Sequence, residues 1–363
     1  MTLKIHSIIA KSAKVPLKRE IGSAGGNKST LDYLIVELKT EEGISGFGYT
    51  MGLGGNGSKA MAPYIQNELA PLVIGHDVSS PERIWNTLWS PNKARMRGGL
   101  GVMSISALDT ACWDAFSKSV SMPLHTILGG FRKKVPVYGS GGWFTFSDND
   151  LVEECQNFMK KGITAYKIKI GTSRDEERIA LLRKEIGNEI TLLVDSNQKY
   201  NIKDAIEVSS MLANYDVKWF EEPVLADSID DLAEFSTKSA VPVAAGENSY
   251  MRWGFREICE RKAAAYLQPD VGRCGGITEF RKIAHLAEAF NLDLCSHLLE
   301  EVSVCLIGAT PAGCMVEYAD LLPADSLTHD FVVHDGHIEV SENPGHGVTF
   351  TKDALKSFCK DTN

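Results

Sequence analysis

The sequence predicts an α/β fold, a modified (β/α)8 TIM-like barrel with a smaller α+β domain before it. Three observations lead to this prediction. Short apolar runs alternate with helical patterns after about residue 135, which is typical of a parallel sheet. Eight such runs occur, the number that closes a sheet into a barrel. The chain has 363 residues, more than one ordinary domain but enough for a barrel and a second domain.

The first domain is expected to span residues 1–125. Its segments 3–15 and 31–50 are rich in β-branched and aromatic residues, as strands are. Glu42-Gly43 interrupts the second segment with a hairpin-turn signal, so we expect paired strands there. Helical patterns follow near residues 60–72, 81–90 and 102–119.

The barrel is expected to span residues 126–324. The helical intervals are exemplified by Ile179, Leu182 and Ile186, which recur on one helical face. Residues 325–363 contain the strand-like DGHIEV and are expected to fold back on the first domain. The eight strand-like runs are VPVYGS (135–140), AYKIKI (165–170), ITLLVDS (190–196), VKWFEE (217–222), VPVAAGE (241–247), AAYLQ (264–268), LDLCSH (292–297) and CMVEY (314–318).

The composition argues against several classes of protein. The net charge is −9 and no basic run occurs, whereas nucleic-acid binders usually carry a basic face. No apolar stretch approaches the length of a membrane span, and MTLKIHSII lacks the long apolar core of a signal peptide. The eight cysteines are scattered without a CxxC pair, which favours reduced thiols. We therefore expect a cytoplasmic protein without nucleic-acid or membrane partners.

Three acids are the most informative residues. Asp195, Glu221 and Glu247 each stand at the C-terminal end of a predicted strand and are 26 residues apart both times. In a barrel they would meet at the mouth, where active sites of this fold lie. Crowded carboxylates repel unless a cation neutralises them, and Mg²⁺ prefers carboxylate oxygens. The alternative, that each acid caps a helix or faces water, is reasonable for one acid but not for three in step. Glu222 should point the other way and act as a support.

Lys167 and Lys169 form a second pattern. Residues two apart in a strand share a face. If that face is the barrel interior, burial and the neighbouring like charge would lower the lysine pKa and make a general base. From this segment alone the alternative is equally open: both lysines face water, with Ile168 and Ile170 inside.

Polar residues also end the later strands. Asp270 follows the sixth run, His297 ends the seventh and Glu317 ends the eighth. A carboxylate bonded to an imidazole fixes its tautomer and stabilises its charged form, so His297 could be a base or acid opposite the lysines. Glu317, if protonated, could donate a hydrogen bond to a substrate oxygen. A single histidine at a strand end is more often structural, but its coincidence with the other groups favours a functional role.

With these motifs in order, the chain resembles the enolase superfamily, specifically its mandelate racemase subgroup, over essentially its whole length. The muconate-lactonising branch carries a lysine on the sixth strand, and AAAYLQPDVGR has none, so that branch is set aside. The motifs that carry the resemblance are the KxK of YKIKIG, VDSNQ at Asp195, FEEP at Glu221, AGEN at Glu247, QPD with Asp270, SHL with His297, and Glu317.

The resemblance implies a role for each residue. The three acids would bind Mg²⁺, and the first domain would cap the barrel. Lys169 would be the base or acid on one face of the substrate, with Lys167 near the substrate carboxylate and lowering the pKa of Lys169. His297, paired with Asp270, would act on the opposite face, and Glu317 would donate to the developing enediolate. Two further residues would contact substrate: Asn197 and Ser140.

The implied chemistry is abstraction of the proton α to a carboxylate, with Mg²⁺, lysine and a donating acid stabilising the enediolate. Loss of a β-hydroxyl would then make a dehydratase giving a 2-keto-3-deoxy acid. Return of a proton on the other face would make a racemase or epimerase of a 2-hydroxy acid. A third possibility is a non-catalytic barrel that binds a ligand or metal, although all the acid, base and metal positions are filled. Relatives generally assemble, which implies a homo-oligomer.

The substrate class is sought in two glycine-rich stretches, 18–30 and 51–59, which we expect to be specificity loops of the capping domain. Their polar character favours a polyhydroxylated acid over mandelate, and GGNG (54–57) resembles the loop of talarate/galactarate dehydratases. The sequence therefore favours an acid sugar, an aldarate or aldonate. The alternative is that the charges only solvate a surface. The polar residues concerned are Lys18, Arg19, Glu20, Asn27, Lys28, Arg95 and Arg97.

Overall fold

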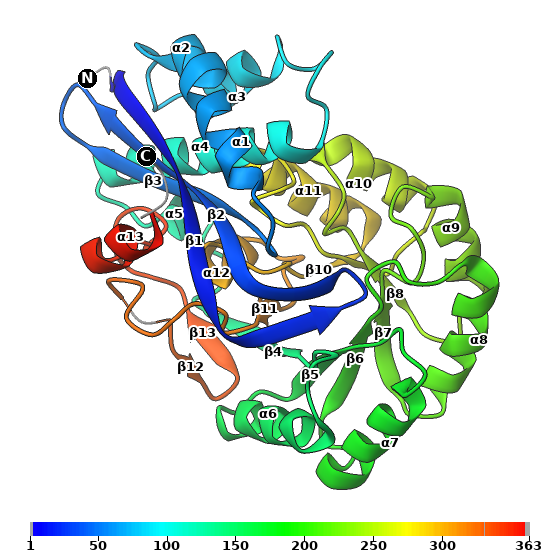
Figure 1. Cartoon of the computed structure of the whole chain (residues 1–363). Helices are drawn as coiled ribbons and strands as arrows, with labels where there is room; N and C mark the ends of the chain where they lie inside the picture. The colour runs from blue at the N-terminus through cyan, green and yellow to red at the C-terminus, as the bar shows by residue number, and fades with distance from the viewer. Residues whose placement is uncertain (1–2, 330, 360–363) are drawn as a thin grey trace.

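The computed structural model describes residues 3–329 and 331–359; residues 1–2, 330 and 360–363, which the expected domain ranges include, lie outside the described part. The first domain contains an antiparallel sheet in the order β1-β2-β3. Helices pack on this sheet, chiefly α4 against β2 and β3 (Figure 1). The bounds are β1 (Ile5–Ser23), β2 (Gly26–Thr40), β3 (Ser45–Gly52), α1 (Gly57–Tyr64), the π-helical turn η1 (Ile65–Leu69), α2 (Ala70–Val73), α3 (Pro81–Trp89) and α4 (Gly99–Ser119).

The stretch 18–30 is a hairpin and not the expected loop. β1 and β2 pair almost to the tip, with Ile21 opposite Lys28 and Ser23 opposite Gly26. The hairpin is held because Ile21 is buried against aromatic residues of the barrel, a contact that its glycine-rich composition did not reveal. Figure 1 shows the hairpin reaching from the first domain over the barrel. The stretch 51–59 keeps a short loop at residues 53–56, between the end of β3 at Gly52 and the start of α1 at Gly57.

The predicted barrel is confirmed. Eight strands pair in parallel in chain order, and the last pairs with the first, β11 with β4. A parallel bridge between Leu294 and Gly313 completes the circle. The strands are β4 (Lys134–Gly141), β5 (Ala165–Lys169), β6 (Thr191–Asp195), β7 (Val217–Glu221), β8 (Val243–Ala245), β9 (Tyr266–Leu267), β10 (Asp293–Leu294) and β11 (Val316–Tyr318).

Helices surround the barrel, and the chain after β11 departs from the regular pattern (Figure 1). In the described residues a hairpin, β12 (Val333–His334) and β13 (His337–Glu339), stands where the last barrel helix would be, with β13 antiparallel to β4. The final helix α13 (Lys352–Phe358) contacts β1 of the first domain. The other helices are α5 (Leu124–Ile127), α6 (Asp148–Lys160), α7 (Asp175–Ile186), α8 (Ile202–Ala213), α9 (Ile229–Lys238), α10 (Met251–Glu260), α11 (Gly276–Phe290) and α12 (Glu300–Ala309).

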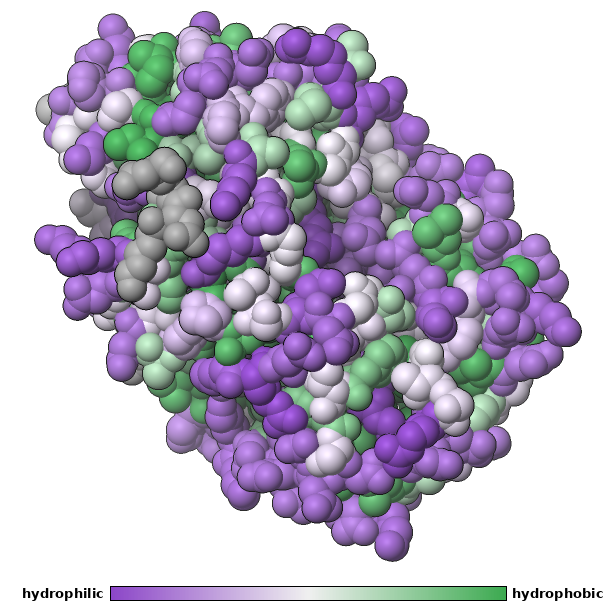
Figure 2. Space-filling view, in the orientation of Figure 1, coloured by the Kyte–Doolittle hydropathy of each residue, from purple (hydrophilic) through white to green (hydrophobic). Residues whose placement is uncertain are grey.

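The barrel interior has an apolar layer below its charged mouth. Outward-facing strand residues, including Ile168 and Val194, join the large core under the helices. The face in Figure 2 is mostly hydrophilic, with apolar side chains in separate patches. Within residues 3–329 and 331–359, no helix combines the length and apolar character that a membrane span needs. The inner apolar layer consists of Tyr138, Ala165, Leu193, Trp219, Ala244, Tyr266 and Cys295.

Candidate active site

The three acids singled out in the sequence lie together at the barrel mouth. Asp195 ends β6, Glu221 ends β7 and Glu247 follows β8, and one carboxylate oxygen from each lies within 4.8 Å of the others. All three are buried. Burial raises the pKa of Glu221 to about 8, against the opposing effect of Lys167. Ionised carboxylates this close together in a buried site repel one another unless nearby cations neutralise them.

A hard divalent cation fits this donor set. Three carboxylates on three successive strands converge from one side and leave the other side for water or substrate. The Oε2 atom of Glu247 is buried without a hydrogen bond, although His297 Nε2 lies 3.1 Å away as an ion pair. A buried carboxylate oxygen in this state is unusual and is suited to metal ligation.

Both lysines point into the barrel, which decides between the two alternatives left open by the sequence. Lys167 Nζ lies 2.7 Å from Glu221 Oε1 and 2.8 Å from Glu317 Oε1. Lys169 forms an ion pair with Asp195. Burial lowers the pKa of each lysine, but these carboxylates outweigh burial and raise it. The expected lowering of the Lys169 pKa is therefore wrong for this arrangement. A cation on Asp195 would act in the opposite direction, because it competes with Lys169 for the same carboxylate.

His297 stands across the barrel from the lysines, since β10 is three strands from β5 in one direction and five in the other. Its Nδ1 lies 2.8 Å from Asp270 Oδ2, the expected pairing. Burial would lower the pKa of His297, but Glu247 and Asp270 raise it to about 10. The imidazole is therefore a cation at neutral pH when no metal ion is on Glu247, and a metal ion there would lower its pKa again. Arg273 Nε lies 3.3 Å from the same Asp270 Oδ2.

Glu317 is an acceptor in this arrangement. It receives hydrogen bonds from Ser140 Oγ at 2.6 Å and from Leu298 N at 2.9 Å. Burial alone would raise the pKa of Glu317, but Lys167 and His297 hold it at about 2. The donation that we expected of Glu317 needs a protonated carboxyl, and here the carboxyl is ionised. The Ser140 hydroxyl, expected to contact substrate, is directed to Glu317.

Several amides position the acids. Asn197, which is also expected to contact the substrate, donates to Asp195 through its backbone N at 2.7 Å and its side chain at 3.2 Å. Sequence reasoning did not single out Gln268, whose Nε2 donates to Glu221 Oε2 at 2.6 Å. It also passed over Asn248, which donates to Glu222 and Glu247. The only indication of these two residues in the sequence was their place near an acid at a strand end, Asn248 in AGEN and Gln268 in QPD.

An apolar cluster, and not the polar residues expected from the sequence, lies next to the charged centre. Ile21 of the hairpin packs with Trp143 and Phe146 after β4. The Trp143 ring centroid lies 5.2 Å from Lys169 Nζ. The polar residues that we expected to select the substrate are mostly exposed, namely Lys18, Arg19, Glu20, Asn27, Arg95 and Arg97.

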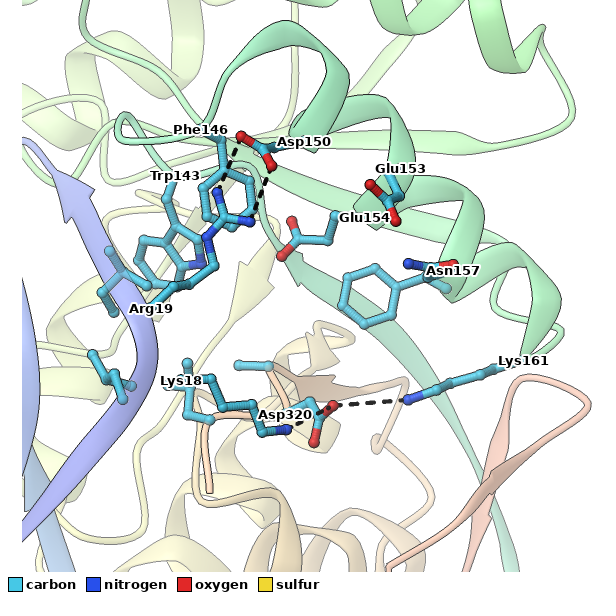
Figure 3. A pocket seen from close by; sticks show the side chains of 15 residues that line it. Lys18, Arg19, Trp143, Phe146, Asp150, Glu153, Glu154, Asn157, Lys161 and Asp320 are labelled. Atoms are coloured by element: carbon cyan, nitrogen blue, oxygen red, sulfur yellow. Dashed lines mark hydrogen bonds and ion pairs between the residues drawn. The ribbon is translucent and has the colours of Figure 1, made fainter. Parts of the chain in front are cut away.

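A pocket of about 320 Å³ lies beyond this apolar cluster, between the hairpin, α6 and residues 319–321 (Figure 3). Two ion pairs join the hairpin to the barrel across it. Arg19 lies 3.2 Å from Asp150, and Lys18 Nζ lies 3.6 Å from Asp320. The charges of the hairpin therefore stand at the outer rim of the mouth, and Trp143 lies between that rim and Lys169.

Comparisons with known proteins agree with this architecture. Residues 5–129 match the N-terminal domain of the mandelate racemase / muconate lactonizing enzyme family, and residues 150–354 match the enolase C-terminal domain-like family. The 3,6-anhydro-α-L-galactonate cycloisomerase of Streptomyces coelicolor is 30% identical over 346 residues, which cover 94% of this chain and 96% of that protein.

Two solved structures are similar over nearly the whole chain. A racemase from Streptomyces coelicolor A3(2) with bound magnesium has a TM-score of 0.93 and 29% identity, covering 97% of this chain and 98% of the other. An L-talarate dehydratase from Polaromonas sp. JS666, complexed with Mg and L-glucarate, has a TM-score of 0.91 and 28% identity, covering 98% and 97%. Magnesium is thus bound in neighbouring structures, and the buried triad here can hold a metal ion. The chain is an enzyme of the enolase superfamily and belongs to its mandelate racemase / muconate lactonizing enzyme family.

Proposed function

We propose that this enzyme removes the proton α to the carboxylate of an acid sugar and eliminates the β-hydroxyl, giving a 2-keto-3-deoxy acid. The observation that carries the proposal is the placement of Lys169 and His297 on opposite sides of a buried carboxylate triad. Asp195, Glu221 and Glu247 would hold Mg²⁺, which supplies a Lewis acid for the substrate carboxylate when bound.

The residues divide the proton transfers. Lys169, in its neutral form, takes the α-proton. His297 starts as the imidazolium, which suits a pKa of about 10, and gives its proton to the leaving hydroxyl so that water departs. Asp270 holds the imidazole by its Nδ1 atom. Lys167, between Glu221 and Glu317, places a fixed positive charge where the substrate carboxylate gains negative charge.

The substrate class proposed is an aldarate or aldonate, with galactarate and talarate as the first examples. A related structure holds L-glucarate with Mg, which supports a six-carbon diacid. A relative that is a cycloisomerase of an anhydro-sugar acid fits the same chemistry. If the β-oxygen belongs to a ring, the same elimination opens the ring and the product is an isomer.

The alternative reaction is racemisation or epimerisation of a 2-hydroxy acid. Its support is the same pair of opposed proton carriers, together with the similar racemase structure. In that reaction His297 returns a proton to the α-carbon and no water leaves. A barrel that only binds a ligand would not need both Lys169 and the His297–Asp270 pair, so that reading is the weakest.

Proton NMR in D₂O with Mg²⁺, on a panel of aldarates, aldonates and mandelate, tests the proposal. Loss of an α-proton signal with a new keto-deoxy product is the expected result. Exchange without product, or appearance of the epimer, would favour the racemase. No exchange on any acid, at enzyme concentrations that allow many turnovers, would contradict α-proton abstraction for these classes.

One double variant tests the assignment of Lys169 and His297 as proton carriers. Lys169→Ala and His297→Ala, combined, should abolish turnover while circular dichroism and Mg²⁺ binding stay as in the wild type. Survival of turnover would contradict the assignment of Lys169 and His297.

We further propose that the protein is a cytoplasmic homo-oligomer. The scattered cysteines support a cytoplasmic location, and analogy with relatives supports assembly. Light scattering with size exclusion measures the assembly.

A further inference from the structure

Arg178 is a buried guanidinium that binds only backbone carbonyls among the hydrogen bonds of the described residues. It is the fourth residue of α7 and is 5% exposed. Its Nη1 donates to the carbonyl of Lys169 at 2.8 Å. Its Nη2 donates to the carbonyls of Gly142 at 2.6 Å and Trp143 at 3.2 Å. One side chain thus joins the end of β5 to the loop after β4.

The three carbonyls belong to the part of the site that handles one face of the substrate. Lys169 is the proposed base, and the Trp143 ring centroid lies 5.2 Å from its Nζ. The Gly142 carbonyl also accepts a hydrogen bond from Lys169 N at 3.3 Å. Gly142 has φ +57, and a Cβ there would lie 2.6 Å from Ile168, so the loop after β4 passes close to β5 at this position.

Arg183, on the same helix, provides a comparison. It also donates to backbone carbonyls, with Nε 2.8 Å from Tyr215 O and Nη1 2.6 Å from Ile190 O. Those carbonyls lie in the segments that enter β6 and β7, at the end of the barrel away from the acids. In this fold, residues at that end of the barrel serve stability, whereas residues at the other end bear on the reaction. The two arginines therefore make the same type of contact at opposite ends of the barrel.

We propose that Arg178 is a positioning residue that sets Lys169 and Trp143 relative to each other, and so fixes the proton carrier on the Lys169 face of the substrate. The inference rests on the role proposed above for Lys169. Three donors in a rigid planar group fix the two backbone segments together more closely than the single hydrogen bond between Gly142 and Lys169. Arg178 itself lies behind the strand and touches neither the acids nor His297.

The test compares Arg178→Met with Arg183→Met, each of which keeps an unbranched apolar stem and removes the donors. In α-proton exchange with Mg²⁺, Arg178→Met should lower kcat by about 10- to 100-fold because the proton carrier is misplaced. Its KM and its Mg²⁺ affinity should stay near the wild-type values, since the metal ligands are untouched. Arg183→Met should lower the Tm but keep kcat. Arg178→Lys, with fewer donors, should lie between the wild type and Arg178→Met.

The two faces of the site sharpen the readout. In the racemisation alternative, where His297 takes the proton as a neutral imidazole, each epimer of the substrate presents its α-proton to one of two bases, Lys169 or His297. Arg178→Met should slow exchange of the epimer that faces Lys169 and leave exchange of the epimer that faces His297 near the wild-type rate. Equal loss on both faces, or a loss that Arg183→Met reproduces, would overturn the positioning role.

Amide hydrogen exchange separates this inference from the proposed function. Arg178→Met should expose the amides of segments 141–146 and 169–172, and Arg183→Met those of 187–191 and 214–217. If the wild type exchanges no α-proton on any acid, the proposed function fails, while this measurement still decides whether Arg178 fixes the two loops. Unchanged exchange in 141–146 and 169–172 would overturn the inference whatever the activity.

Discussion

The two ends of the barrel interior are built by the same strands and have opposite chemistry. Leu193 and Asp195 lie two apart on β6, and so share a face; Trp219 and Glu221 do the same on β7. The first of each pair belongs to the inner apolar layer and the second to the charged mouth. A step of two residues, about 6–7 Å along a strand, therefore separates a packed core from the reaction centre.

The comparison teaches which end stabilises the fold. In the apolar layer the Trp219 ring lies 5.2 Å from Tyr138 and 5.1 Å from Tyr266, centroid to centroid, as aromatic packing favours. At the mouth, buried carboxylates oppose one another and are only partly offset by the lysines and His297. The charged mouth that carries the function therefore destabilises the fold, and the inner apolar layer below it stabilises the fold.

The largest expected effect breaks the charged end alone. Glu221→Gln should lower turnover by at least about 10³-fold, because it removes a metal ligand. In EDTA it should also lower the Tm, because the amide nitrogen of glutamine would face one of the two donors on this carboxylate, Lys167 Nζ at 2.7 Å or Gln268 Nε2 at 2.6 Å. The wild type should gain Tm with added Mg²⁺, and the variant should gain little. Glu222→Gln, the matched change one residue on, should keep the Mg²⁺ response; if both variants lose it, the ligand assignment is wrong.

Breaking the apolar end should do the reverse. Trp219→Ala should destabilise the fold by about 3–5 kcal/mol, because it leaves a cavity in the inner layer. At a temperature where the variant is folded, kcat should stay within about tenfold of the wild type, since Trp219 lies in the layer below the charged mouth. Urea unfolding and initial rates measure the two effects. A Trp219→Ala variant with normal stability and no turnover would contradict the assignment of stability to the apolar layer and of the reaction to the charged mouth.

A buried carboxylate away from both layers shows how burial changes a pKa where no metal ion is expected. Asp109 of α4 accepts hydrogen bonds from Thr278 N at 2.8 Å and Thr278 Oγ1 at 2.7 Å, at the junction with the start of α11. Burial raises its pKa from 3.8 to about 7. The folded state then binds the proton more tightly than the unfolded state. Its contribution to stability is therefore present below pH 3.8 and is lost as the pH rises from 3.8 to about 7.

Asp109→Asn should remove that pH dependence. At roughly 1.4 kcal/mol per pKa unit, the wild type should lose up to about 3 kcal/mol between pH 5 and pH 7.5 relative to the variant. Urea unfolding of both proteins at pH 5 and pH 7.5 gives the difference, and the variant cancels the contribution of all other acids. A wild type that gains stability relative to Asp109→Asn on going to pH 7.5 would contradict the sign.

The smallest effect concerns a hydroxyl at the charged end of the barrel. Ser140→Ala removes the hydroxyl that donates to Glu317 at 2.6 Å. Glu317 keeps two other partners, Lys167 Nζ and Leu298 N. Turnover should fall by about 3- to 10-fold, the effect of one hydrogen bond to a charged group that keeps other partners. Ser140→Thr should keep most of the activity by keeping the hydroxyl. A loss as large as that of Glu221→Gln would show that Ser140 contacts the substrate directly.

Much of the fold and of the site could be predicted from the chain alone. Alternation of apolar runs with helical patterns is a local property, so the eight barrel strands were located by their periods. Parallel strands end at the same edge of a sheet, so acids at the ends of three successive runs had to converge. The pairing of His297 with Asp270 followed from the same reasoning and from the family resemblance.

Only the tertiary structure decided the properties that depend on neighbours distant in the sequence. Lys167 and Lys169 fit the interior or the surface equally well by pattern, and carboxylates on other strands draw them inside. Those carboxylates also reverse the expected direction of the Lys169 pKa. The hairpin at 18–30 is ordered by Ile21 against Trp143, and Arg178 finds its three carbonyls on two other segments. Hydrophobic periodicity and residue type can be read from the local sequence. Charge balance, burial and the hydrogen bonds of backbone groups depend on all the residues that folding brings nearby.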